Sequence, residues 1–62
     1  MFVRLNNAIV NMNNIVYIEV NRKIGIHIIV MCNDSEIYIN DDEFKILIDA
    51  IKRMNNESNI SN

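Results

Sequence analysis

Apolar and polar residues alternate along the first two-thirds of the chain, and after residue 40 this pattern is replaced by apolar residues at helical spacing. Alternation places successive side chains on opposite faces of a strand, whereas apolar residues three and four apart share one face of a helix. The chain therefore predicts several strands followed by one helix. Strands and helices that are segregated in this way indicate the α+β class.

Short polar segments divide the alternating part into separate strands. We expect strands at residues 2–5, 8–12, 15–20, 26–32 and 36–39. Asparagine and aspartate tolerate the positive φ of tight turns, and Asn6-Asn7, Asn13-Asn14 and Asn33-Asp34 lie between these strands. Because every connection is short, neighbouring strands are expected to pair antiparallel. The prediction is an antiparallel meander of four to five strands.

The residues after the last strand carry the signals of a helix N-terminus. Asn40 followed by Glu43 resembles a capping box, and two aspartates lie in the first turn, where the helix dipole favours carboxylates. The apolar residues share one face: Phe44, Leu47, Ile48, Ile51 and Met54. We expect one C-terminal helix from about residue 41 to 54, packed on one sheet face. Residues 1–54 would then form one domain, and residues 55–62 a flexible polar tail.

A chain of 62 residues is marginally stable alone and usually needs a disulfide, a metal or a partner subunit. The single cysteine, Cys32, excludes an intramolecular disulfide. The single histidine, His27, would leave a zinc site dependent on carboxylates. We therefore expect no metal and no cofactor, and we expect a homo-oligomer.

Parity within the predicted strands sorts their residues onto two faces. The face expected to receive the helix is aliphatic: Val3, Leu5, Ala8, Val10, Val16, Ile18, Val20, Ile26, Ile28, Val30, Ile37 and Ile39. The opposite face also carries large apolar groups: Phe2, Ile9, Ile15, Tyr17, Ile29, Met31 and Tyr38. An exposed apolar patch of this kind usually marks an interface, so we expect the second set to form the oligomer interface. A register slip or a bulge would redistribute both faces.

Polar residues of the second face form a candidate recognition surface. They are Arg4, Tyr17, Glu19, His27 and Tyr38. Tyrosine offers a large contact area with a polar tip, and arginine pairs with carboxylate or phosphate. These residues could bind a protein partner or a small anionic nucleotide; the alternative is that they form the rim of the self-association interface.

Few residues of this chain could act as nucleophile and base. His27 and Cys32 are five residues apart on one predicted strand, so they point to opposite faces, and Cys32 is expected to be buried at the strand end. The run Asp41-Asp42-Glu43 is interpreted as helix capping rather than as a metal site. We expect a binding protein with no catalytic residue, not an enzyme.

Charge and hydropathy restrict the partners and the compartment. The net charge of −2 argues against a nucleic-acid polymer, which demands a basic surface. The longest apolar run, Ile28 to Cys32, is far too short to span a membrane, and no signal peptide is visible. Together with one unpaired cysteine, these features predict a cytoplasmic protein.

Residues 1–51 resemble the small FlbD-type flagellar and swarming-motility proteins. The resemblance rests on Leu5-Asn6-Asn7 after an apolar opening strand, on Ile15-x-x-Ile18-Glu19, and on a hairpin that leads to an acidic-capped helix. The chain departs from that pattern at Asn33-Asp34, where a turn glycine is usual. It also looks like short phage or mobile-element accessory proteins with a β-meander and one helix.

These observations lead to three functional expectations. The first is a homo-oligomeric binding protein, a phage-like or mobile-element accessory factor that blocks a host protein. The second is a sponge that sequesters a nucleotide-like signalling ligand at subunit interfaces. The third, implied by the resemblance, is a motility accessory protein.

Overall fold

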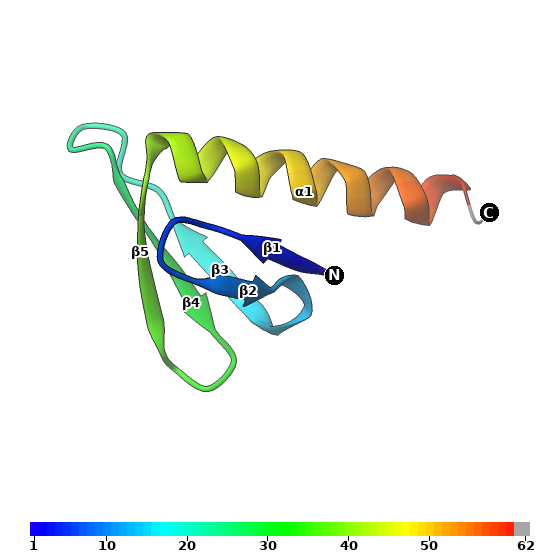
Figure 1. Cartoon of the computed structure of the whole chain (residues 1–62), viewed down its shortest axis with the longest axis horizontal. Helices are drawn as coiled ribbons and strands as arrows, with labels where there is room; N and C mark the ends of the chain where they lie inside the picture. The colour runs from blue at the N-terminus through cyan, green and yellow to red at the C-terminus, as the bar shows by residue number, and fades with distance from the viewer. Residues whose placement is uncertain (61–62) are drawn as a thin grey trace.

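Five strands and one helix make up the chain in the computed structural model, which describes the backbone of residues 1–60 and the side chains of residues 1–56. They are β1 (Phe2–Arg4), β2 (Ile9–Asn11), β3 (Ile15–Glu19), β4 (Ile26–Met31), β5 (Glu36–Asn40) and α1 (Asp41–Ile60). The antiparallel strands followed by one helix confirm the predicted α+β class (Figure 1).

The strands form two antiparallel sheets. β1 pairs with β2, and β3, β4 and β5 form a second sheet in sequence order. A short 3-10 turn, Met12–Asn14, connects the sheets, and the side chain of Asn11 accepts a hydrogen bond from the N–H of Asn13 at its start. The predicted pairing of the second strand with the third is therefore wrong, because this turn directs the chain from β2 into the other sheet.

The predicted capping box is present at the start of α1. Asn40 Oδ1 accepts a hydrogen bond from the N–H of Glu43 at 2.9 Å, and Glu43 Oε1 accepts one from the N–H of Asn40 at 3.0 Å. The helix continues to Ile60, beyond the predicted end at residue 54. The flexibility of residues 55–62 stays a prediction, and residues 61–62 lie outside the described residues.

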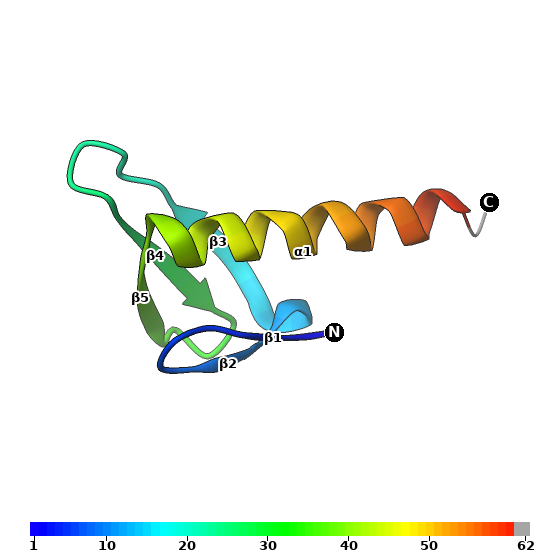
Figure 2. The ribbon, with the colours of Figure 1, turned by 45° about the horizontal axis from the view of Figure 1, so that its top comes forward.

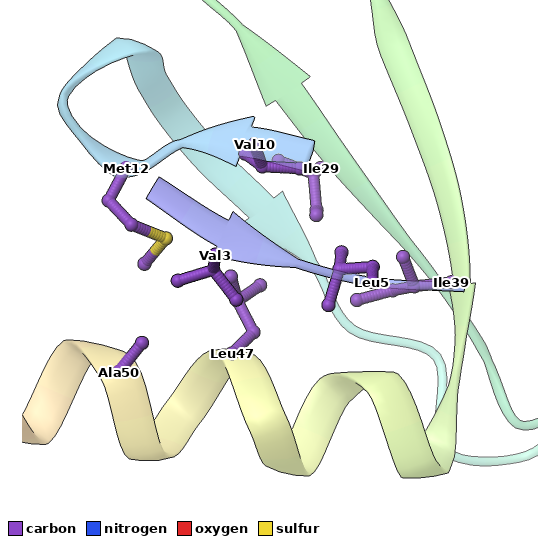
Figure 3. Packing of buried hydrophobic residues seen from close by; sticks show 8 residues of the cluster. All are labelled: Val3, Leu5, Val10, Met12, Ile29, Ile39, Leu47 and Ala50. Atoms are coloured by element: carbon purple, nitrogen blue, oxygen red, sulfur yellow. The ribbon is translucent and has the colours of Figure 1, made fainter. Parts of the chain in front are cut away.

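The hydrophobic core lies between α1, the β1–β2 hairpin and one face of the three-stranded sheet (Figure 2). Figure 3 shows Leu47 and Ala50 of α1 pointing toward the strands, with Val3 and Met12 opposite them. The buried residues of this core are Val3, Leu5, Val10, Met12, Ile29, Ile39, Leu47 and Ala50. We call the sheet face toward α1 the inner face and the opposite one the outer face.

The side chains of β4 point opposite to their predicted directions. His27 and Ile29 are fully buried on the inner face, whereas Ile28 and Val30 are half-buried on the outer face. Alternation cannot decide this strand, because residues 28–31 are apolar at both parities. Ile26 was also expected beneath the helix, but it is exposed because it shares the outer side of β4 with Ile28 and Val30.

A β-bulge in β3 changes the sheet face to which some of its side chains point. Ile15 pairs with Met31 and Tyr17 pairs with Val30, so Val16 is the additional residue. Ile15 packs against the core and Val16 is 62% exposed, so the predicted faces of both are wrong. Val20, directly after the strand, is also exposed rather than beneath the helix. The bulge is the alternative that the sequence left open.

Candidate interaction surface

The outer face of the three-stranded sheet is the candidate site, because no element among residues 1–60 packs over it, whereas α1 lies on the inner face. Strand register places Ile26 and Asn40 at one end of this face and six residues at its centre: Tyr17, Glu19, Ile28, Val30, Glu36 and Tyr38. They form two rows across the sheet. One row runs Tyr17–Val30–Glu36 and the other runs Glu19–Ile28–Tyr38. Each row therefore has an aliphatic centre, a tyrosine at one edge and a carboxylate at the other.

Exposure and charge distinguish this surface from an ordinary solvated sheet face. Tyr17 and Tyr38 are 57% and 63% exposed, and the Tyr38 hydroxyl donates a long hydrogen bond of 3.4 Å to Glu36 Oε1. The three strands contain no lysine or arginine. The outer face thus combines exposed aromatic area with negative charge, which suits apolar or basic groups better than phosphates.

The structure brings together three of the five predicted recognition residues. Tyr17, Glu19 and Tyr38 share the outer face. Arg4 lies on β1 in the other sheet, where it pairs with Ile9. His27 is buried on the inner face, so one chain does not bring these five residues together on one surface.

The seven predicted interface residues are similarly divided. Tyr17 and Tyr38 are exposed on the outer face, and Phe2 and Ile9 are 70% and 64% exposed on the β1–β2 hairpin. The other three pack with the core: Ile15, Ile29 and Met31. Ile29 in particular is 0% exposed, which removes it from any surface of this fold.

His27 makes structural hydrogen bonds. Its Nδ1 accepts a hydrogen bond from the N–H of Asn21 at 3.1 Å, and its Nε2 lies 2.8 Å from Asp41 Oδ1. Because Nδ1 is an acceptor, the pattern assigns the ring hydrogen to Nε2, which donates to Asp41. The ring centroid lies 4.4 Å from that of Phe44. With both nitrogens engaged and no exposed surface, this histidine joins the loop before β4 to the start of α1.

Sequence reasoning missed a groove of about 570 Å³ between the β3–β4 loop and α1. Its lining residues are Arg22, Asp41, Phe44, Lys45, Ile48, Asp49 and Lys52. Helical spacing could have placed the six α1 residues together, but only the tertiary structure adds Arg22. Three cations and two carboxylates line the groove, so neither sign of charge predominates strongly.

The described residues assemble no metal centre. No group of three or more histidine, cysteine, aspartate or glutamate residues comes together among them as a metal site. Cys32 is exposed in the turn before β5, so its predicted burial is wrong because β4 ends at Met31. In this part of the chain, no helix is both long and apolar enough to cross a membrane.

Comparison with protein-family models, with curated proteins and with solved structures found no match. The resemblance to FlbD-type proteins therefore stays a prediction that rests on the sequence pattern alone.

Proposed function

We propose that this chain is a non-enzymatic binding module that acts as a homo-oligomer and binds protein through its outer face. The observation that supports this proposal is the pair of exposed tyrosines beside Ile28 and Val30 on an uncovered sheet face. Tyrosine is enriched in protein interfaces, since its large ring contributes apolar area and its hydroxyl finds polar partners.

The apolar area of this face is sufficient to drive association. A fully buried tyrosine removes about 150–250 Å² from water, and apolar burial contributes roughly 25 cal/mol per Å². Burying Tyr17 and Tyr38 together with the exposed parts of Ile28 and Val30 therefore contributes on the order of several kcal/mol, before the costs of association. A domain this small, which has one cysteine and hence no internal disulfide, gains stability from such burial.

The charge of the outer face favours protein over nucleotide as its ligand. Glu19 and Glu36 would repel phosphate groups, and Arg4, the residue expected to bind them, lies on the other sheet. We therefore favour a protein-binding module over a nucleotide sponge. A phage-like factor that blocks a host protein and a motility accessory protein are the two biological roles that such a face would serve.

The test is light scattering coupled to gel filtration, over a range of protein concentrations. We expect the wild-type mass to exceed the 7.3 kDa of one chain, and a Tyr17→Lys/Tyr38→Lys variant to return to it. Ile9→Lys is the matched control, because Ile9 is equally exposed but lies on the β1–β2 hairpin. A monomeric wild type at about 100 μM, a concentration that saturates micromolar association, would contradict the proposal. So would a mass that responds only to Ile9→Lys.

A further inference from the structure

Strand β5 forms an open edge of the three-stranded sheet, since β4 is its only paired neighbour among the described strands. The N–H of Met31 donates to the carbonyl of Ser35 at 2.9 Å, which makes these two residues a hydrogen-bonded pair. Bonded and non-bonded pairs alternate along an antiparallel ladder. Ile37 and Ile39 therefore bond to β4, while the backbone groups of Glu36 and Tyr38 point away from it.

We propose that β5 of a second copy of this chain pairs antiparallel with this edge, about a two-fold axis at Tyr38. This inference rests on the proposed function: it keeps the homo-oligomer and places the contact between its copies at the β5 edge, which leaves the outer faces free to bind a protein partner. Two three-stranded sheets would become one continuous six-stranded sheet, with the paired backbone groups excluded from water. An axis at the centre of the strand places the five residues of β5 opposite the five residues of the second β5.

This register is chemically self-complementary. The two Tyr38 residues would exchange both of their backbone hydrogen bonds at the axis. The N–H of Asn40 already donates to Glu43 Oε1, so the capping box ends the available edge at this residue. Glu36 lies opposite Asn40 rather than opposite the other Glu36, which avoids a like-charge pair.

The opposite edge of the sheet is less suited to pairing. β3 carries the bulge at Val16, and bulges disrupt the regular spacing that a further strand requires. β5 pairs with β4 without interruption from Glu36 to Asn40, and it contains no proline, lysine or arginine to block an approaching strand. Glu36 and Tyr38 are both exposed. β3 therefore has a bulge, a feature that normally prevents edge-to-edge association, whereas β5 has none.

Pairing at this edge would also extend the candidate interaction surface. On the outer face, Tyr38 of one copy would lie beside Tyr38 of the other, at the centre of a continuous surface. On the inner face, the half-buried Ile37 would lie opposite Ile39 of the second copy. The dimer would thus present both outer faces to a partner on the same side.

Two lysine substitutions on the same face distinguish edge pairing from face-to-face packing. Tyr38→Lys places two ammonium groups beside the axis and should weaken the dimer at least about tenfold, whereas Tyr17→Lys on the bulged edge should leave the dissociation constant within about twofold. Equal weakening by both variants would overturn the edge proposal and leave the proposed function in place. A wild-type monomer at all concentrations would overturn both. Circular dichroism of each variant verifies that it remains folded.

A cysteine cross-link tests the position of the axis independently of dimer strength. In a Cys32→Ser background, Tyr38→Cys should form a covalent dimer under mild oxidation, because bonded partners in an antiparallel pair have Cα atoms about 5.5 Å apart, within disulfide range. Tyr17→Cys is the control and should form at most about a tenth as much cross-linked dimer, since its Cα atoms would lie far beyond that range. Equal cross-linking at both positions would overturn the proposal.

Discussion

The carboxylate of Glu43 accepts a hydrogen bond from the backbone N–H of Asn6 at 3.0 Å, across 37 residues of sequence. Its other oxygen accepts the N–H of Asn40 in the capping box. One buried side chain thus joins the tip of the β1–β2 hairpin to the start of α1, and this contact helps to hold the two sheets on the same helix.

Replacing Glu43 by alanine should lower the free energy of unfolding by about 1–3 kcal/mol. The substitution leaves the N–H groups of Asn6 and Asn40 without their acceptor in a partly buried place. Asp42→Ala, in the same helical turn but exposed, should cost less than about 1 kcal/mol. Urea denaturation at one fixed protein concentration measures both. Equal losses would show that only helix-dipole charge matters at this terminus.

His27 should be more important for stability than its partner Asp41. His27→Leu leaves the N–H of Asn21 without an acceptor and should cost about 1–3 kcal/mol. The side chain of Asp41 is 64% exposed, so water can replace its carboxylate, and Asp41→Ala should cost less. Thermal unfolding of the two variants gives the comparison. A larger loss for Asp41→Ala would contradict the structural role assigned to the histidine.

The side-chain directions in β4 can be tested with a pair of isoleucines. Ile29→Ala removes a fully buried side chain and should cost about 2–5 kcal/mol. Ile26→Ala, on the outer side and 39% exposed, should cost less than about 1 kcal/mol. Chemical denaturation should separate the two midpoints clearly. A larger loss of stability for Ile26→Ala than for Ile29→Ala would support the side-chain directions that simple alternation predicts for β4.

Gly25 should resist substitution, because its φ is +69° and an added Cβ would lie 3.1 Å from Asp41 Oδ2. Left-handed backbone disfavours residues with a Cβ, so Gly25→Ala should reduce stability by about 1–2 kcal/mol. Asp34 has a φ of 68° in the β4–β5 turn, and Asp34→Gly should therefore leave stability unchanged or raise it. Destabilisation by Asp34→Gly would indicate that its side chain, and not the backbone, determines this turn.

Local patterns predicted most of the secondary structure correctly. The asparagine-rich breaks separate five strands, and Asn40 with Glu43 marks the start of α1, because turn and capping preferences depend on neighbouring residues only. The end of α1 was predicted too early. The polar residues after Met54 make no apolar stripe, but the helix continues through them as far as Ile60.

The candidate site was only partly predictable. Tyr17, Glu19 and Tyr38 share a face as expected. Apolar and polar residues alternate clearly in β5 and in the part of β3 that follows the bulge. His27 and Ile29 were placed on the wrong face, since β4 is apolar at both parities and one histidine carries no directional signal by itself. The partners that hold His27 inward, Asn21 and Asp41, lie 6 and 14 residues away and belong to other elements.

The sequence by itself determined where most of the strands and the helix begin and which residue caps the helix, because those choices depend on contacts within a few residues. Only the tertiary structure decided that β2 leads into a second sheet, that Val16 bulges out of β3, and that Glu43 also binds Asn6. Each of these features depends on which distant groups remain to be buried or hydrogen-bonded once the elements pack together.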